Sequence, residues 1–414
     1  MSVPGFWRHV VTVLGGALGA QALPLLAAPL ITRMCTPSEM GAFAVWLGVV
    51  AVSAIAATLR LETAMILDHE PAQQRVCFSV VVYSASVTGL LVSLCALAAH
   101  ALGVPALHDQ SWGGLLVLGL GTWLTATTQT TLAYATSHKA FGKAARAKVW
   151  GAATIALTQV LLLAAGAGEA GLLAGQLVGL AAGLVAAVWL LRPPRPRLAL
   201  RLDAAAHAYL LRHQKFWRFS LPSNLLNALV GQMPLFLIGM RHGALAAGLY
   251  ALTQRVLSAP VSLLASSVLE VFKRESVHEF QTLGHCSHAY RYTFKALSLL
   301  GLGPALVLLL FSPQLFGWVF GPSWRAAGEL AQILAPLCFL NFIASPLSYV
   351  FFVAGKQQVD LLWQIALFLM TLCAFLFPGT LRQNVLWYAG GYSLLYLVYL
   401  HMSWQISQNR LATV

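Results

Sequence analysis

Long apolar runs recur along the whole chain and are separated by short polar segments. A helix needs about 20 predominantly apolar residues to cross the hydrocarbon core of a bilayer, and about twelve of the runs approach that length. The approximate spans are 10–31, 41–59, 76–98, 113–134, 149–167, 170–191, 219–240, 247–270, 296–312, 326–354, 359–377 and 386–404. The pattern predicts an all-α integral membrane protein with about 12 transmembrane helices, six in each half of the chain.

The composition supports this interpretation. Of 414 residues, 59% are hydrophobic and only 9% are charged, whereas soluble domains carry about 25% charged residues. The six cysteines are scattered without metal-site or disulfide spacing, so we expect small apolar side chains in helices. The first run follows Arg8 and contains Ala20-Gln21-Ala22, which resembles a signal-peptidase site. Because that run continues to Ile31, we expect an uncleaved first helix.

Basic residues are distributed unevenly between the two predicted sides. With the N-terminus in the cytoplasm, about 20 Lys and Arg fall inside and about 4 fall outside. This bias predicts a multi-pass protein with both termini cytoplasmic. The net charge of +13 is therefore assigned to topology, with anionic membrane lipids as secondary partners and no nucleic acid.

A basic, proline-rich stretch at 192–218 divides the chain near its midpoint. Proline ends the preceding helix, and the remainder predicts a short amphipathic helix at the inner surface. We expect an N-terminal six-helix bundle at 1–191, a cytoplasmic basic linker at 192–218 and a C-terminal six-helix bundle at 219–414.

The two halves resemble diverged copies. In the first half Gln21, Pro24, Arg33, Gly41 and Glu62 occur in the same order as Gln232, Pro234, Arg241, Gly248 and Glu270 in the second. Because six helices separate the copies, both halves begin on the same side of the membrane. The pattern predicts a parallel pseudo-repeat.

Polar groups interrupt the two apolar runs between Phe219 and Glu275, which a tight turn at 241–246 joins. An unpaired polar group in hydrocarbon costs several kcal/mol, so these groups should face partners or a wet cavity. The cavity candidates that could bond sugar hydroxyls are Asn224, Asn227, Gln232, Gln254 and Gln21. Interhelical hydrogen bonds are the alternative for these amides, and for Gln332 and Asn341.

Arg255 is the sharpest candidate for substrate contact. It follows Gly248 by seven residues and so lies about 10 Å inside the outer end of its predicted helix. A guanidinium at that depth needs a carboxylate, carbonyls, water or an anionic substrate, and its planar fork suits a diphosphate. Snorkelling to the interface and a structural ion pair remain open.

Other charged residues lie near the predicted helix ends. Arg33 and Arg241 could attract an anionic headgroup or simply anchor the helices at the outer interface. Arg60 and Glu62 are spaced i,i+2 and should not face each other on a helix. Glu270 precedes Lys273 and Arg274 at ion-pair spacing, and ion coupling or gating is the alternative for Arg60, Glu62 and Glu270.

Neither a catalytic constellation nor a phosphate-binding GxxxxGK[ST] sequence occurs in the chain. No catalytic residue, metal site or cofactor is predicted, and H⁺ or Na⁺ coupling is left open.

Four stretches together resemble the Wzx-type oligosaccharide flippases, the polysaccharide transporter family of the MOP exporter superfamily. They are PLITRMCTPSEMGAFAVW with LRLETAMIL (29–67), SHKAFGKAARAKVW (137–150), SLPSNLLNALVGQMPLFLIG with AAGLYALTQRVLSAPVSLL (220–264), and LFGWVFGPSWRAAGELAQILAP with SPLSYVFFVAGKQQ (315–358). They occur in the order of that family and span nearly the whole chain.

The resemblance implies a MATE-like fold of two six-helix bundles in the bacterial inner membrane. It implies movement of an undecaprenyl-diphosphate-linked oligosaccharide to the periplasmic leaflet, powered by an ion gradient and serving lipopolysaccharide O-antigen or another surface polysaccharide. A partner glycan polymerase and chain-length complex would then act on the product. The chain departs from an expected charge-rich cavity, because Arg255 is its one clear central cation.

Two alternatives remain. An ion-coupled small-molecule or drug antiporter of the same superfamily would need buried carboxylates for a cationic substrate. A membrane glycan polymerase or glycosyltransferase would need paired carboxylates or a sizeable outside loop. A non-transporting scaffold does not explain the intramembrane Arg and amides.

Overall fold

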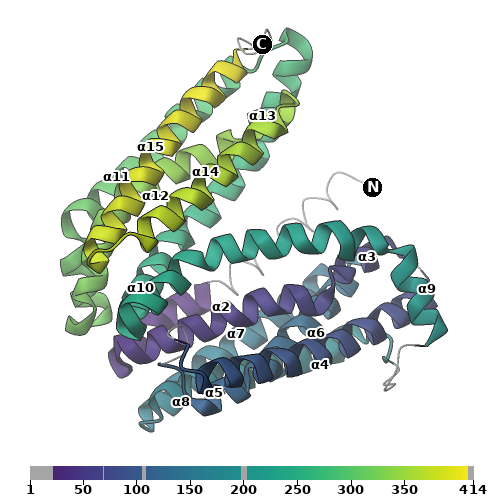
Figure 1. Ribbon diagram of the computed structural model, residues 1–414. Helices are drawn as coiled ribbons and strands as arrows, with labels where there is room; N and C mark the ends of the chain where they lie inside the picture. Colours follow the sequence, from purple (N-terminus) through teal and green to yellow (C-terminus); the bar gives the residue numbers. More distant parts are fainter. Residues whose placement is uncertain (1–21, 69, 105–108, 197–202, 409–414) are drawn as a thin grey trace. The chain divides into compact units, whose positions relative to one another are not determined.

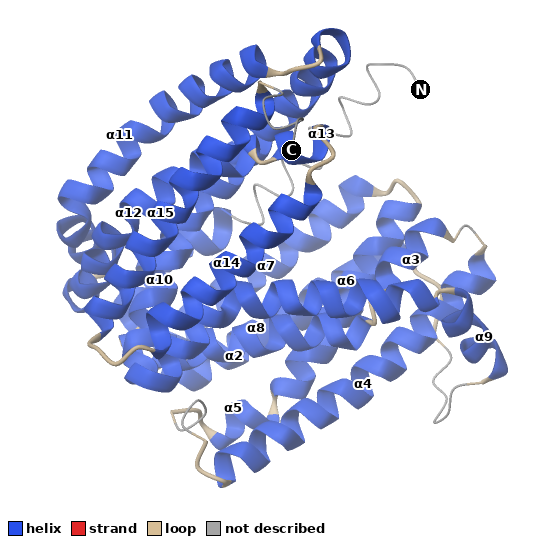
Figure 2. Cartoon of the chain, turned by 45° about the horizontal axis from the view of Figure 1, so that its top comes forward, coloured by secondary structure: helices blue, strands red, loops and turns tan. Residues whose placement is uncertain are grey.

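Helices are the regular elements of the part of the chain that the structure describes, and they lie in two compact units (Figures 1 and 2). The structure is a computed structural model that describes residues 22–68, 70–104, 109–196 and 203–408. The first unit is Met1–Gly248 and the second is Leu249–Val414. The expected all-α membrane architecture is confirmed.

The first unit contains an apolar helix at Ala22–Met34 and the elements from α2 to the first part of α10. These are α2 (Pro37–Thr58), α3 (Leu61–Leu67), α4 (Pro71–Ala101), α5 (Trp112–Leu116), α6 (Leu118–Ser137), α7 (Phe141–Ala164), α8 (Gly168–Leu191), α9 (Ala204–Arg212), a π-helical turn (Phe216–Ser220) and α10 (Leu221–Leu283). The second unit holds the rest of α10, α11 (Ser287–Phe320), a 3-10 turn (Pro322–Trp324), α12 (Arg325–Leu347), α13 (Tyr349–Val353), α14 (Gln357–Leu376) and α15 (Leu381–Ser407).

Seven described segments are long and apolar enough to cross a membrane, and Ala22–Met34 and Leu362–Leu376 are shorter apolar helices. The protein is therefore a multi-pass membrane protein. The helix α6 is less apolar because it is rich in threonine. Its Thr127 and Thr131 hydroxyls donate to carbonyls one turn earlier, Trp123 O and Thr127 O, at 2.7 and 2.8 Å. These bonds satisfy hydroxyls that lie away from water.

The predicted spans correspond to helices, although several boundaries differ. The span 113–134 divides into α5 and α6 at Val117, and 326–354 divides into α12 and α13 at Ser348. The helices around the spans 247–270 and 296–312 run further, since α10 ends at Leu283 and α11 begins at Ser287.

The turn expected at 241–246 is a kink in α10 at Gly243, where φ is +79°. A left-handed φ favours glycine, which has no Cβ to clash. Asp109 accepts a hydrogen bond from the backbone N–H of Ala244 at 2.7 Å. A carboxylate from a distant loop therefore caps the helical segment that begins after the kink.

Small residues allow close helix packing in the first unit. A Cβ added to Gly151 of α7 would lie 3.2 Å from the Cα of Gly183 in α8. A Cβ on Gly89 of α4 would lie 2.7 Å from the carbonyl O of Gly119 in α6. Close backbone approach at small residues is typical of helix pairs in membranes, where packing rather than hydrophobicity holds helices together.

Gly41 and Gly248, which are equivalent positions of the predicted internal repeat, each pack against the helix that carries the other. A Cβ on Gly41 of α2 would clash with the carbonyl O of Ala244, and a Cβ on Gly248 would clash with that of Pro37. Gly41 follows Pro37 by one helical turn, as Gly248 follows Ala244. The contact is thus reciprocal, as an isologous contact across a two-fold axis would be. It agrees with the predicted parallel repeat.

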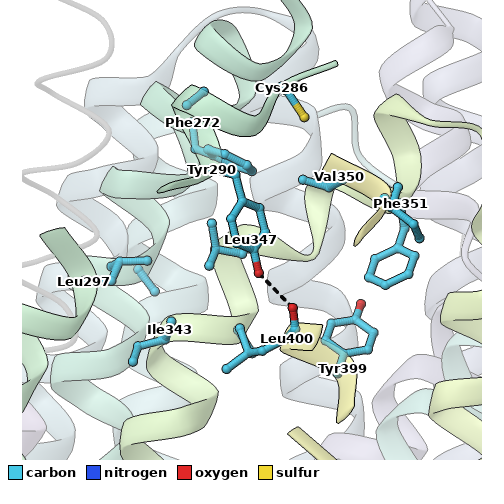
Figure 3. Close-up of a cluster of buried hydrophobic side chains, with 14 of the residues drawn as sticks. Phe272, Cys286, Tyr290, Leu297, Ile343, Leu347, Val350, Phe351, Tyr399 and Leu400 are labelled. Carbon is cyan, nitrogen blue, oxygen red and sulfur yellow. Dashed lines mark hydrogen bonds between the residues drawn. The ribbon is translucent and has the colours of Figure 1, made fainter. Parts of the chain in front are cut away.

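The core of the second unit gathers side chains from α10, α11, α12, α13 and α15 around Tyr290. Figure 3 shows Tyr290 directed toward Leu400. The Tyr290 hydroxyl donates a hydrogen bond to the Leu400 carbonyl O at 3.2 Å. The same hydroxyl lies 2.6 Å from Ser403 Oγ. Phe351 and Tyr399 stack with ring centroids 4.7 Å apart. The bonds of Tyr290 hold the start of α11 against the end of α15, and the stacked rings hold α13 against α15.

The stretch 192–218 contains α9, in agreement with the short helix expected there. The helix α8 ends at Leu191 before Pro193 and Pro194, and Asp203 caps α9 by accepting from Ala206 N at 2.8 Å. The division into bundles at 1–191 and 219–414 stays a prediction, as does the count of twelve spans.

Candidate functional site

The amide candidates on the first part of α10 differ in their surroundings. Asn224 is half-buried and donates to Ser220 O of the preceding turn at 2.8 Å. Gln232 lies against Gly48 of α2, because a Cβ on that glycine would be 3.2 Å from Gln232 Oε1. Asn227 is exposed. Asn227 and Gln232 therefore remain the better-placed candidates for hydrogen bonds to a ligand on this segment.

Arg255 and Gln254 lie on the second part of α10, which belongs to the other unit. Arg255 is half-buried and Gln254 is exposed. The segment begins after the Gly243 kink, so Arg255 lies about 16 Å along it, deeper than the turn position alone suggested. Thr253 donates to Ala327 O at 2.8 Å and fixes this turn of α10 on α12. This bond anchors the helical turn that carries Arg255.

Two further cavity candidates, Arg33 and Arg241, lie close to the end of a helix and to the Gly243 kink, respectively. Arg33 and Arg241 are both exposed, as an interfacial position requires. Gln21 lies outside the described residues. Two further amides make the interhelical bonds that were the alternative: Gln332 Nε2 donates to Leu309 O at 2.6 Å, and Tyr396 donates to Asn341 Oδ1 at 3.1 Å.

Arg60 and Glu62 form an ion pair, which corrects the expectation that they would not face each other. Arg60 Nη1 lies 2.9 Å from Glu62 Oε1, and the two side chains are 28% and 12% exposed. The i,i+2 argument failed because these residues are not on one helix. Leu59 and Arg60 both adopt left-handed φ values, +51° and +58°, between α2 and α3.

The break between α2 and α3 is strained and is fastened locally. Two successive non-glycine residues with positive φ cost about 1–3 kcal/mol each. The backbone N–H of Arg60 donates to Thr58 Oγ1 at 3.3 Å, and the next residue, Leu61, is fully buried. Arg60 Nε and Glu62 Oε2 are buried without a hydrogen-bond partner among the described atoms. The pair therefore keeps polar capacity for a proton, an ion or a substrate group.

Glu270 lies 2.8 Å from Lys273 Nζ in an i,i+3 pair, and its side chain is 73% exposed. This is the ordinary surface ion pair that was one of the two interpretations, and such pairs contribute about 0–1 kcal/mol. Its role in ion coupling stays a prediction.

Sequence reasoning missed a buried polar cluster that joins α9 to the connection between α3 and α4. Tyr209 donates to Asp68 Oδ2 at 2.6 Å, and His213 Nε2 lies 3.4 Å from the same oxygen. The three side chains are at most 9% exposed. Gln74 donates to the carbonyl O of Asp68 at 2.8 Å. We call Asp68, Tyr209 and His213 the α9 latch.

Burial, followed by the neighbouring Cys77 and Asp68, raises the pKa of the Tyr209 phenol well above its ordinary value. The phenol therefore stays protonated at neutral pH and continues to donate to Asp68. Asp68 and Tyr209 are separated by 141 residues, and both fall in segments that hydropathy assigns to connections. The amphipathic pattern of α9, with Tyr209 and His213 one turn apart, was the one available signal.

The model of a family described as polysaccharide biosynthesis protein matches residues 30–329. The chain belongs to the polysaccharide biosynthesis protein family. It is also 26% identical over 156 residues to the teichuronic acid biosynthesis protein TuaB of Bacillus subtilis (strain 168). That match covers 37% of this chain and 32% of TuaB, so it spans about a third of the relative's length.

Solved transporter structures share the fold of this polysaccharide biosynthesis protein. The lipid II flippase MurJ in an inward closed conformation superposes with a TM-score of 0.71 at 12% identity, over 97% of this chain and 91% of MurJ. An inward-facing multidrug resistance MATE family transporter of the MOP superfamily gives 0.63 at 14% identity, over 95% and 96% of the two chains. At these identities the similarity shows a shared fold, which is the MATE-like fold that the resemblance implies. The family match over residues 30–329 supports the resemblance itself.

Proposed function

We propose that this polysaccharide biosynthesis protein is a non-enzymatic transporter that flips a lipid-linked oligosaccharide. The substrate is an undecaprenyl-diphosphate-linked oligosaccharide, moved by alternating access from the cytoplasmic to the periplasmic leaflet of the bacterial inner membrane. The family match across residues 30–329 carries the proposal, because it joins polysaccharide biosynthesis to a chain with a transporter fold. The product would enter surface polysaccharide synthesis, for example of O-antigen.

The polar side chains within apolar helices support a polar path. Arg255 would hold the diphosphate through paired N–H donors. The amides that would bond sugar hydroxyls are Asn224, Asn227, Gln232, Gln254 and Gln21. Arg33 and Arg241 would attract the anionic headgroup at the outer ends of their helices.

Ion coupling would supply the energy in this proposal. Arg60, Glu62 and Glu270 are the charged groups that we assign to H⁺ or Na⁺ coupling or to gating. Glu62 is the strongest of the three, because its Oε2 is buried and without a bonded partner among the described atoms. Both termini would be cytoplasmic, and a glycan polymerase with its chain-length regulator would receive the flipped product.

The experiment that tests the proposal locates the lipid-linked oligosaccharide in cells with and without this protein. We expect complete lipid-linked repeat units to accumulate on the cytoplasmic side when the protein is absent. A wild-type copy restores export in the matched control. Units that still reach the periplasm but stay unpolymerised would favour a membrane polymerase instead.

A second candidate function is ion-coupled export of a small molecule or drug. The shared fold with a multidrug resistance MATE family transporter favours it. The same experiment separates the two, because an unchanged distribution of both glycan pools, together with loss of resistance to a small molecule, would support the exporter.

A further inference from the structure

The end of α10 and the start of α11 form a hairpin that is longer than a bilayer is thick. From the Gly243 kink to Leu283, α10 has roughly 40 residues and is about 60 Å long. The 34 residues of α11 make it about 51 Å long. The hydrocarbon core is about 30 Å thick, so part of each helix projects beyond it. Positive-inside reasoning places this projection in the cytoplasm.

The hairpin is rigid. Glu279 of α10 accepts from the first backbone N–H groups of α11, those of His288 at 2.9 Å and Ala289 at 2.7 Å. Cys286 N donates to Ser407 O at 2.9 Å and ties the turn to the end of α15. Phe272 of α10 and Tyr290 of α11 are buried in the core of the second unit (Figure 3). Both arms are therefore held in place.

A cavity of about 970 Å³ opens between the two arms. This volume lies at the upper end of the range for ligand pockets, about 300–1,000 Å³. Its floor is apolar and includes Phe272 and Ala289. Its hydrogen-bonding side chains come from both arms: Glu275, His278, Thr282, His288, Tyr292 and Thr293.

The chemistry of this wall suits sugars. Carboxylate, imidazole and hydroxyl groups offer both donors and acceptors to sugar hydroxyls. Tyr292 is 73% exposed, so its ring can lie against the apolar face of a sugar ring. Such a mixture of an apolar floor and a few polar groups is typical of small-molecule sites.

The charge of the wall restricts which sugars fit. Glu275 and Glu279 contribute carboxylates, and Lys and Arg do not occur among the described residues that line the cavity. Of the cations on the same helical turns, Lys273 pairs with Glu270, and the Arg291 guanidinium lies 5.3 Å from the ring centroid of Trp404. Arg274 and Lys295 are exposed and are not among the residues that line the cavity. Like charges brought together in an interface are costly, so a uronic acid would be disfavoured.

We propose that this cavity binds the glycan of the transported lipid on the cytoplasmic side, and that it takes neutral or amino sugars in preference to uronic acids. The inference rests on the proposed function, since a lipid-linked oligosaccharide in the inner leaflet projects its sugars into the cytoplasm beside the hairpin. The cavity would engage the glycan before the diphosphate reaches Arg255.

Binding of soluble sugars to the full-length protein in nanodiscs tests this inference. The probes are fully N-acetylated chitotetraose, which is neutral, and tetragalacturonate, which has the same number of rings and four carboxylates. Saturation-transfer NMR should detect chitotetraose binding and at least fivefold weaker binding of tetragalacturonate. His278→Ala and Tyr292→Ala should each weaken chitotetraose binding at least fivefold, while the control His207→Ala on the exposed side of α9 should not.

Several outcomes would overturn the inference: no binding of chitotetraose, equal binding of both sugars, or unchanged binding by both cavity variants. Thr282→Val replaces any cavity variant whose melting temperature falls. The binding assay uses soluble sugars without a lipid carrier and does not measure transport. A negative result would therefore overturn the cavity proposal without contradicting the proposed function, which the leaflet experiment tests. Conversely, sugar binding by a protein that flips nothing would refute the proposed function alone.

Discussion

The pair of Arg60 and Glu62 shows how one backbone break changes what two residues can do. On a continuous helix they would point about 160° apart, but two left-handed residues bring Arg60 Nη1 within 2.9 Å of Glu62 Oε1. Each of the two charged side chains stabilises the charge of the other at a position where little water reaches them. Removing one should therefore cost more than losing a surface pair.

Glu62→Gln should lower the free energy of unfolding by roughly 1–3 kcal/mol, because it leaves the partly buried Arg60 without its carboxylate partner. The melting temperature in detergent measures this change. The control is Glu270→Gln, whose side chain is 73% exposed and whose pair should be worth less than about 1 kcal/mol. Equal shifts for the two variants would show that the buried pair is not special. Adding Arg60→Met to Glu62→Gln should recover part of the loss.

Arg255→Ala should reduce glycan export at least tenfold and leave the amount of inserted protein unchanged. The substitution removes a half-buried cation but leaves the apolar length of its helix intact. Export in a strain that depends on this protein is the measurement. Arg382→Ala, at an exposed position of α15, is the control. Normal export by Arg255→Ala would refute its assignment to the diphosphate.

Among the helices, the short helix α9 depends on the α9 latch for its stability. The helix has nine residues, and helices this short are marginal in water without tertiary contacts. The Asp203 cap, the buried Ala206 and the bond from Tyr209 to Asp68 supply those contacts. The end of the linker is thereby fixed to the first unit.

Tyr209→Phe should loosen α9 by about 1.5–3 kcal/mol, the usual contribution of a hydrogen bond to a charged group. Faster amide hydrogen exchange in α9 would report it, with His207→Ala as the exposed control on the same helix. Unchanged exchange in Tyr209→Phe would mean that packing alone holds α9.

The wild-type protein should also lose this contribution at high pH. The pKa of Tyr209 is higher in the folded protein than the ordinary phenol value of about 10, so folding favours the protonated form. The stabilisation is complete below about pH 10 and declines as the pH rises above it. Tyr209→Phe should lack this component, which thermal unfolding at a series of pH values would test.

Hydropathy located the helices because apolar length is a local property of sequence. The Gly243 kink was also predictable, since glycine and basic residues interrupt the pattern there. The break at Leu59 and Arg60 was not, because neither residue favours a positive φ and only tertiary packing stabilises one. The α9 latch was invisible for a similar reason: its partners are 141 residues apart.

The site was predictable only in part. Arg255 stands out because a cation within an apolar run is costly, and the structure places it half-buried as that argument requires. The cavity of the α10–α11 hairpin was missed because its polar residues are spread over two helix ends whose separation the sequence does not reveal.

The reciprocal contact of Gly41 and Gly248 leads to a paired prediction. Gly41→Ala and Gly248→Ala should each destabilise the protein by about 1–3 kcal/mol, because a methyl group would strike a backbone carbonyl that cannot move aside. Gly231→Ala is the control, since a Cβ there meets open space within α10. Its melting temperature should stay equal or rise, because alanine favours helix. Tolerance of both alanines would show that the helices can separate at little cost.

For the whole molecule, the proposed function requires transport that is driven by an ion gradient. Proteoliposomes that contain only this protein, and lipid-linked glycan extracted from cells that lack it, should show flipping without ATP. An imposed H⁺ or Na⁺ gradient should accelerate the initial rate several-fold, and empty liposomes are the control. A strict need for ATP, or the same rate with either gradient as with none, would contradict ion coupling.

The Gly41–Gly248 contact also bears on how such a chain arises. If one gene for a six-helix protein were duplicated and fused, its product would first have assembled as a homodimer. In that homodimer the glycine at the helix contact would lie beside the same glycine of the second subunit. One Gly→Ala mutation in the gene would therefore have placed two methyl groups in the contact, one from each subunit. Selection against side chains there would have acted on both copies together, before fusion allowed the halves to diverge. The surviving glycines, each against the other's helix, are what that ancestry would leave.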